Sequence, residues 1–212
     1  MNHLFTIYRN VIQADSESRT PLTDSKLSLP WTGLKGRRRL PMKKHDLPIV
    51  KTFEYTKIIG IENIEFGTGV ILDDFVLIYA KKKIRIGNYV HIACFSSVTG
   101  GEETTMEDFS GLSQGCRILT GTEDFKDWGF GNPTIPLQYR NVRMAPIHIG
   151  KFCIIGANSV VLPGVTIGEG AMVGACSVVS KDLAPWGIYI NNKRVGERNK
   201  TGVLKNYEHF LG

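Results

Sequence analysis

The sequence predicts an all-β protein: a left-handed parallel β-helix of about five coils, with an irregular N-terminal extension and a short C-terminal tail. Two observations predict this fold. A strict six-residue period runs through residues 149–184, and the same period recurs upstream in groups of three. Because three six-residue units make one triangular turn, each group accounts for one coil.

The C-terminal repeat is the clearer of the two. Each unit begins with a branched aliphatic residue and carries a mostly small residue at its fifth position. A helix would place apolar residues three and four apart, and a half-buried strand would alternate, so neither explains a period of six. The six consecutive units read IGKFCI, IGANSV, VLPGVT, IGEGAM, VGACSV and VSKDLA.

Three earlier groups extend the pattern, and extra residues fall only between groups. We therefore expect every insertion to leave the prism from one corner. The first position fills the interior, a small residue packs beside it at the fifth, and glycine at the second lets the backbone turn. The first positions of these groups are Ile64, Val70 and Val76, then Ile86, Ile92 and Val98, then Met106, Leu112 and Ile118.

These patterns divide the chain into three parts. Residues 1–57 form a partly irregular N-terminal extension, and residues 58–184 form the β-helix with a loop insertion at 120–146. Residues 185–212 form a tail that we expect to fold over the last coil, because the open end of a β-helix needs covering.

Composition limits the class of protein. With 212 residues and 42% hydrophobic content, the chain can bury one proper core. No apolar run reaches the roughly 18 residues of a membrane span, and the N-terminus does not resemble a signal peptide, so we expect a cytoplasmic protein. Cys116 and Cys153 fall on the small fifth position, where a thiol packs as a compact hydrophobic group.

The net charge of +6 matches one basic stretch, residues 35–44, which holds six cations. It is either a solvated linker or a weak contact for an anionic glycan or a membrane surface. Nucleic acid is the least favoured partner, because the stretch lacks interleaved aromatic residues and no nucleic-acid-binding fold is indicated.

The run IGANSVVLPGVTIGEGAMVGACSVVSKDLAPWGIY, followed by KRVGER, resembles the final coils and CoA-binding tail of the hexapeptide-repeat acetyltransferases. The resemblance covers roughly residues 58–200, and the family includes galactoside, maltose, serine and lipopolysaccharide or capsule O-acetyltransferases. It implies a homotrimer that binds acetyl-CoA as co-substrate in the groove between neighbouring β-helices, with no metal.

The same resemblance assigns the CoA contacts. Small residues would let the pantetheine arm approach the coil, and cations would face the adenine and phosphates. For each small residue, repeat geometry is an equal explanation, and for each cation a solvated surface is. The matching positions are Gly156, Ala157, Gly174 and Ala175 for pantetheine, and Ser180, Lys181, Arg194 and Arg198 for the nucleotide end. Asn191 and Asn192 replace the family's Gly-x-Pro-Ala.

The catalytic position departs from the family. Its members usually carry a histidine base after Thr-x-Thr, but here the matching run is TGTED. Glu123 or Asp124 could act as the base, or His91 could reach the groove from a neighbouring subunit. Alternatively, the acceptor is an amine that needs little activation, or the chain is inactive.

The insertion at 120–146 carries residues suited to a sugar: aromatic faces and side-chain donors, in a loop that a compact solenoid does not need. Packing within a trimer is the other explanation for it. The candidate substrate contacts are Trp128, Asn132, Tyr139 and Arg140.

We therefore expect an acetyl-CoA-dependent O-acetyltransferase that modifies a saccharide hydroxyl, a reaction that suits bacterial surface polysaccharide synthesis. An N-acetyltransferase of a nucleotide-linked amino sugar is the alternative enzyme, and a non-catalytic β-helix scaffold is the alternative class. A zinc hydratase of the γ-carbonic anhydrase type needs three histidines, whereas only His91 and His148 lie in the repeats.

Overall fold

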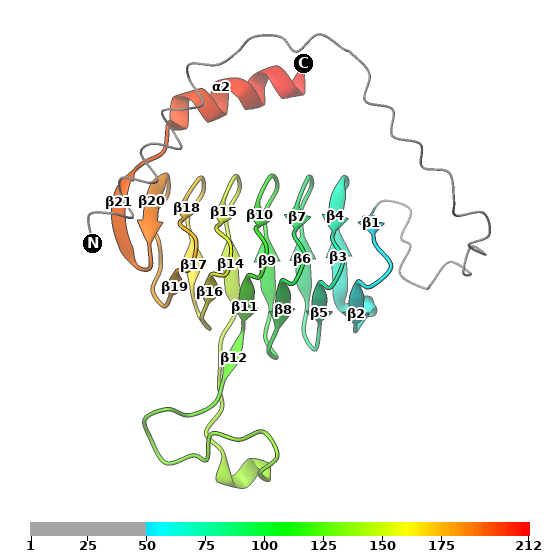
Figure 1. Cartoon of the computed structure of the whole chain (residues 1–212), viewed down its shortest axis with the longest axis vertical. Coiled ribbons are helices and arrows are strands. Elements are labelled where there is room, and N and C mark those ends of the chain that lie inside the picture. Colours follow the sequence, from blue (N-terminus) through cyan, green and yellow to red (C-terminus); the bar gives the residue numbers. More distant parts are fainter. Residues whose placement is uncertain (1–49) are drawn as a thin grey trace, which may run out of the picture. The chain divides into compact units, whose positions relative to one another are not determined.

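The computed structural model describes residues 50–212, and within them it confirms the predicted left-handed parallel β-helix. Short strands wind around a triangular prism and stack into three sheets with parallel pairing, as Figure 1 shows. The basic stretch 35–44 and most of the predicted extension lie outside the described residues.

Each sheet forms one side of the prism. Sheet A contains β1 (Val50–Thr52), β4 (Val70–Leu72), β7 (His91–Ile92), β10 (Gly111–Leu112), β15 (Ile154–Ile155), β18 (Met172–Val173), β20 (Gly187–Ile190) and β21 (Lys193–Glu197). Sheet B contains β2 (Lys57–Ile59), β5 (Leu77–Tyr79), β8 (Ser97–Thr99), β11 (Arg117–Leu119), β16 (Val160–Val161) and β19 (Val178–Val179). Sheet C contains β3 (Ile64–Phe66), β6 (Ile84–Ile86), β9 (Thr104–Met106), β14 (Ile147–Ile149) and β17 (Thr166–Ile167).

The first coil starts at β1, inside the range that the sequence assigned to the extension, so the described residues contain six coils. The register expected for the first upstream group was wrong by two residues. Phe66, Leu72 and Ile78 lie in line with the inward residues of the next coil, in place of Ile64, Val70 and Val76. Val70 and Val76 are also buried, which is why an apolar pattern alone did not separate the two registers.

The interior is a stack of mostly aliphatic side chains that come from the strands of all three sheets. Ile118 and Ile155, for example, are fully buried. Small fifth-position residues pack beside them, and burial raises the pKa of the Cys153 thiol to about 11. The thiol therefore stays protonated and donates a hydrogen bond to the Gly168 carbonyl at 3.0 Å, as a structural cysteine does.

Every insertion leaves from the edge between sheets B and C, as expected. We call this edge the loop corner; it comprises residues 60–63, 80–83, 100–103, 120–146, 162–165 and 180–182. At 120–146 the chain runs out as an antiparallel pair, β12 (Gly121–Thr122) with β13 (Arg143–Met144), and carries the short helix η2 (Leu137–Tyr139). Figure 1 shows this loop projecting away from the coils.

An aromatic ladder follows the edge between sheets C and A, which we call the aromatic corner. Its rings belong to Tyr89, Phe109, Phe152 and Trp186, all in left-handed backbone conformation, with φ between 55° and 61°. That conformation costs about 1–2 kcal/mol for a non-glycine residue. Neighbouring rings lie 5.1–6.3 Å apart, so ring–ring contacts offset part of this cost.

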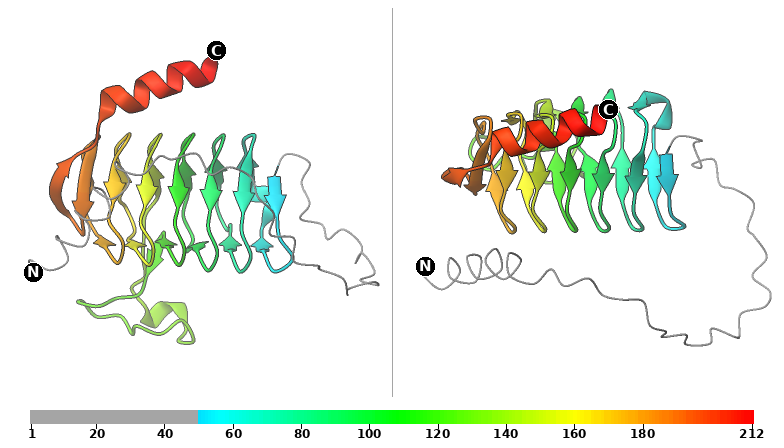
Figure 2. Two further views of the ribbon diagram at one scale, coloured as in Figure 1. Left: turned by 45° about the horizontal axis from the view of Figure 1, so that its top comes forward. Right: turned by 90° about the horizontal axis from the view of Figure 1, so that it is seen from above.

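The C-terminal tail closes the last coil. β20 and β21 form an antiparallel hairpin, and the helix α2 (Lys200–Leu211) follows it. Two α2 rings, those of Tyr207 and Phe210, contact the aromatic ladder edge-on. Figure 2 shows α2 running along the coils from the hairpin. No helix among residues 50–212 is long and apolar enough to cross a membrane.

Truncating one rung of the interior tests the fold. We expect Ile118→Ala to lower the free energy of unfolding by about 2–5 kcal/mol, because it leaves a cavity in a closed stack. Urea denaturation followed by circular dichroism measures this. The control is Leu211→Ala in α2, where the side chain is 67% exposed and the change should be about 0.5 kcal/mol or less. Equal losses in both variants would contradict the assigned register.

Candidate active site

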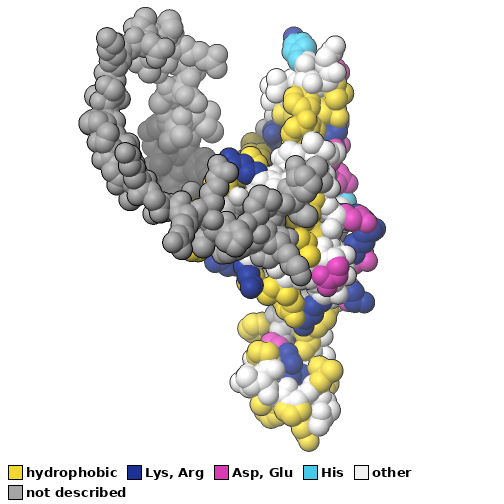
Figure 3. Space-filling view, turned by 90° about the vertical axis from the view of Figure 1, so that its right-hand side faces the viewer, with side chains coloured by type: hydrophobic (Ala, Val, Ile, Leu, Met, Phe, Trp, Pro, Cys, Tyr) yellow, Lys and Arg dark blue, Asp and Glu magenta, His cyan; other side chains and the backbone are white. Residues whose placement is uncertain are grey.

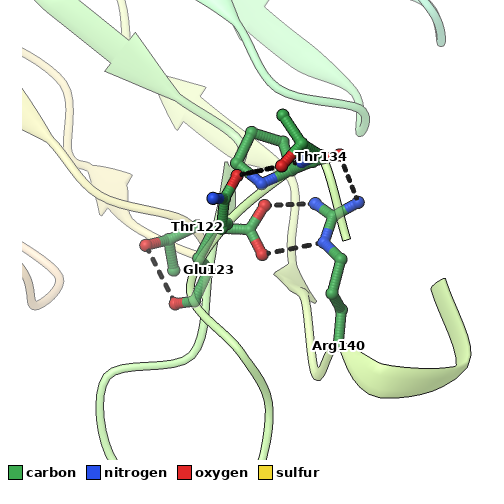
Figure 4. Close-up of polar contacts among 6 residues, drawn as sticks. Thr122, Glu123, Thr134 and Arg140 are labelled. Carbon is green, nitrogen blue, oxygen red and sulfur yellow. Dashed lines mark hydrogen bonds and ion pairs between the residues drawn. The ribbon is translucent and has the colours of Figure 1, made fainter. Parts of the chain in front are cut away.

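The carboxylate at the family's histidine position is held by an arginine. Glu123 Oε2 accepts a hydrogen bond from Arg140 Nε at 3.1 Å, and Oε1 contacts Arg140 Nη2. Both side chains are largely shielded, with 21% and 15% of their surfaces exposed. Figure 4 shows the guanidinium facing both oxygens of Glu123, with Thr122 and Thr134 nearby. Each oxygen of Glu123 thus accepts from the guanidinium, so the carboxylate is held in place as the counter-charge of Arg140.

Asp124 organises the start of the loop. Its carboxylate accepts hydrogen bonds from the backbone N–H groups of Lys126, Asp127 and Gly129, and from the Asn141 side chain. These bonds hold the pKa of Asp124 well below its ordinary value, the Asp127 N–H contributing most. A carboxylate bound in this way is a weak proton acceptor. Its hydrogen bonds to three backbone N–H groups make it a cap for the turn.

The loop exposes the side chains that the sequence proposed for a substrate. Trp128 is 67% exposed and Tyr139 53%. Asn132 accepts hydrogen bonds from Thr134, and Arg140 is committed to Glu123. Figure 3 shows the loop, at the lower end of that view, with mostly hydrophobic and uncharged side chains on its surface. Their role in substrate binding stays a prediction.

His91 lies elsewhere, on the outer side of sheet A. Its Nε2 is 3.0 Å from Asp73 Oδ2, and its side chain is 52% exposed. Within one chain, therefore, the three candidate bases do not form one cluster: Glu123 and Asp124 lie in the loop, and His91 lies on a side of the prism that the loop does not leave from.

The predicted CoA contacts are spread over several edges. Gly156, Ala157, Gly174 and Ala175 follow β15 and β18, on the edge between sheets A and B. Ser180 and Lys181 lie on the loop corner, in the coil below β17.

The hairpin contributes the remaining candidates. The Oδ1 atom of Asn192 accepts the backbone N–H groups of Ser180 and Lys181 at 2.9 and 3.2 Å, so this departure from the family has a structural role. Arg194 pairs with Glu197 at 3.1 Å. Arg198 donates to the carbonyls of Phe152 and Gly170 at the aromatic corner, where burial lowers its pKa.

One polar pair was not identified from the sequence. His148 Nε2 is 3.1 Å from Glu107 Oε1, on the outer side of sheet C. His148 also lines a groove of about 460 Å³ at the foot of the loop, together with Thr105, Ala145, Gly164 and Thr166. One sequence signal could have found the pair, because Glu107 stands at the second position of its hexapeptide, where the repeat favours a small residue.

No group of three histidine, cysteine or acidic side chains placed to hold a metal ion occurs in residues 50–212. The polar groups near the loop come instead in pairs, Glu123 with Arg140 and His148 with Glu107. Such pairs suit binding, orientation and proton transfer.

Comparison with known proteins decides the family. A sequence model described as "Bacterial transferase hexapeptide (six repeats)" matches residues 146–181. The dTDP-4-amino-4,6-dideoxy-D-glucose acyltransferase of Escherichia coli is 35% identical over 154 residues, which cover 71% of this chain and 80% of that protein. The chain belongs to the hexapeptide-repeat acyltransferases. This confirms both the resemblance and the expectation of an enzyme.

Two further relatives widen the comparison. The putative lipopolysaccharide biosynthesis O-acetyl transferase WbbJ of Escherichia coli K12 is 34% identical over 70% of this chain and 71% of its own length. The crystal structure of AntD, an N-acyltransferase from Bacillus cereus in complex with dTDP and 3-hydroxybutyryl-CoA, superposes with a TM-score of 0.72 at 34% identity. It covers 76% of this chain and 86% of AntD.

The Asp124 cap should make the stability of the loop depend on pH in this hexapeptide-repeat acyltransferase. A lowered folded-state pKa means that the cap stabilises the loop fully above the ordinary aspartate pKa of about 3.9, and loses this effect as the pH falls toward the folded value. Proteolysis of the loop at neutral pH should be slow in the wild type and faster in Asp124→Asn. Asp127→Asn is the control, because that carboxylate is not part of the cap; equal cleavage of both variants would contradict the prediction.

Proposed function

We propose that this protein transfers an acyl group from a CoA thioester to the amino group of a sugar carried on a nucleotide. Two relatives support the acceptor class: one is named for a dTDP-linked amino sugar, and the other is an N-acyltransferase crystallised with dTDP. The coarser function, acyl transfer to a sugar, is also consistent with WbbJ.

The pairing of Glu123 with Arg140 is the observation that carries the choice of an amine. An alcohol must lose its proton as it attacks the thioester, so it depends on a positioned base. Here both oxygens of the carboxylate at the family's histidine position bind a guanidinium. A neutral amine carries its own lone pair and attacks first, so it depends less on a group at that place.

The acyl donor is acetyl-CoA or a related thioester. The structural relative was crystallised with 3-hydroxybutyryl-CoA, so the acyl chain is not limited to acetyl within the family. Ser180 and Lys181 lie on the loop corner one coil below the groove beside Gly164, so a CoA bound along this edge would lead toward the loop. The family's nucleotide contacts at these two positions therefore suit this route.

A homotrimer belongs to the same proposal. Large apolar side chains are exposed on the outer sides of sheets A and B, where a neighbouring prism would cover them. They include Ile59, Leu77, Tyr79, Val178, Ile188 and Ile190.

O-acetylation of a saccharide is the second candidate. It is supported by the likeness to WbbJ and by the His91–Asp73 pair, which offers an alcohol a histidine base oriented by a carboxylate. In a trimer this base would come from the outer side of sheet A of a neighbouring subunit.

Acceptor choice separates the two candidates. The purified protein is given acetyl-CoA and either dTDP-4-amino-4,6-dideoxy-D-glucose or the matched dTDP-6-deoxy-D-glucose, and free thiol is followed with time. We expect thiol release with the amino sugar at least about a hundredfold faster than with the hydroxyl sugar. Faster release with the hydroxyl sugar would establish O-acetylation, and no release with either would refute both acceptors.

The Glu123–Arg140 pair gives a second kinetic prediction. Glu123→Gln leaves the shielded Arg140 guanidinium without its counter-charge, so the loop loosens. We expect the KM for the acceptor to rise more than kcat falls. Lys126→Gln, an exposed change in the same loop, is the control. A fall in kcat of about 10²–10⁴-fold with unchanged KM would instead identify Glu123 as the base.

A further inference from the structure

Glu107 departs from a pattern that four other coils share. The residue that follows sheet C at the aromatic corner is glycine in four other coils: Gly67, Gly87, Gly150 and Gly168. A Cβ atom added at any of these glycines would lie 2.5–2.8 Å from a neighbouring atom. A side chain at this position therefore conflicts with the local geometry of the fold, and the third coil nevertheless places a glutamate there.

Both oxygens of Glu107 have defined partners. Oε2 accepts the backbone N–H of Lys151 at 2.9 Å, which fixes the carboxylate against the next coil. Oε1 lies 3.1 Å from His148 Nε2. Glu107 thus orients the imidazole in the way a carboxylate orients a catalytic histidine, and the second ring nitrogen, Nδ1, has no hydrogen-bond partner in residues 50–212.

The surroundings of His148 are open and polar. Its side chain is 42% exposed, and it lines the groove of about 460 Å³ with two threonines, Thr105 and Thr166. The groove reaches the loop corner through Ala145 and Gly164, and β17 on its far side is one coil from Ser180. The groove therefore extends from His148, in the same coil as the loop, toward the coil next to Ser180.

We infer that His148 is the proton acceptor of the transferase reaction and that Glu107 is its positioning residue. This rests on the proposed function. The acceptor nitrogen attacks the thioester carbonyl carbon, so that a C–N bond forms and the C–S bond breaks. His148 Nδ1 takes the proton from the attacking nitrogen and passes it to the leaving sulfur, which departs as the free thiol of CoA. The acidic groups that face the imidazole are Glu107 and, across the groove, Glu103.

Chemical rescue tests the role of His148. In His148→Ala we expect kcat to fall about 10²–10⁴-fold, with the KM for acyl-CoA changed by less than about threefold. Added imidazole should restore part of the lost rate by occupying the space left in the groove. The control is Glu65→Gln, which removes an exposed carboxylate from the same side of sheet C and should leave kcat unchanged.

Glu107→Gly separates catalysis from folding. It introduces the glycine that four other coils carry, so the melting temperature should stay equal or rise. The turnover number kcat should fall about tenfold or more, because the imidazole loses its orienting partner. A purely structural Glu107 would give the opposite pattern, with a lower melting temperature and unchanged kcat.

The outcomes distinguish this inference from the proposed function. Transfer by the wild type that persists in His148→Ala, or that is lost there without rescue by imidazole, overturns the role of His148 alone. Absence of transfer by the wild type to any amino or hydroxyl sugar overturns the proposed function and the inference together. Rescued activity with a stable Glu107→Gly variant of low kcat supports both roles.

Discussion

The aliphatic stack inside the prism is the constraint on which the rest of the structure depends. One inward residue per strand, repeated along three sheets, buries the interior completely and fixes where each coil turns. Since the turns are fixed, outer side chains at equivalent positions of successive coils stack in columns. The position of a polar residue in the repeat therefore decides which side chains it can contact. Glu107 and the four corner glycines illustrate this, because their shared register makes the exception visible.

The site combines two kinds of order. The sheets hold His148 and His91 in defined columns, each beside a carboxylate. The loop lies outside these sheets. Its own polar contacts, the Asp124 cap and the Glu123–Arg140 pair, hold its conformation. A rigid solenoid that carries one internally braced loop suits an acyltransferase that binds both a CoA thioester and a sugar.

Much of the fold was predictable, because the period of six follows directly from the geometry of a triangular coil. The common edge for the insertions was predictable for the same reason, because they fall only after complete groups of three six-residue units. The register near the start of the β-helix was missed because Val70 and Val76 are buried as well as the inward Leu72 and Ile78, so hydrophobicity alone did not define it. The pairing of Glu123 with Arg140 could not be predicted from the sequence, because it joins residues 17 positions apart in a loop without a repeat.

The hairpin that ends the solenoid also sets its length. A stack of parallel coils finishes in strands whose N–H groups could accept another coil, from the same chain or from another molecule. Here Asn191 accepts the N–H of Val178, Asn192 accepts those of the next turn, and β21 reverses direction. At this end of the stack the hairpin therefore occupies the place where a further coil, from this or another molecule, would add.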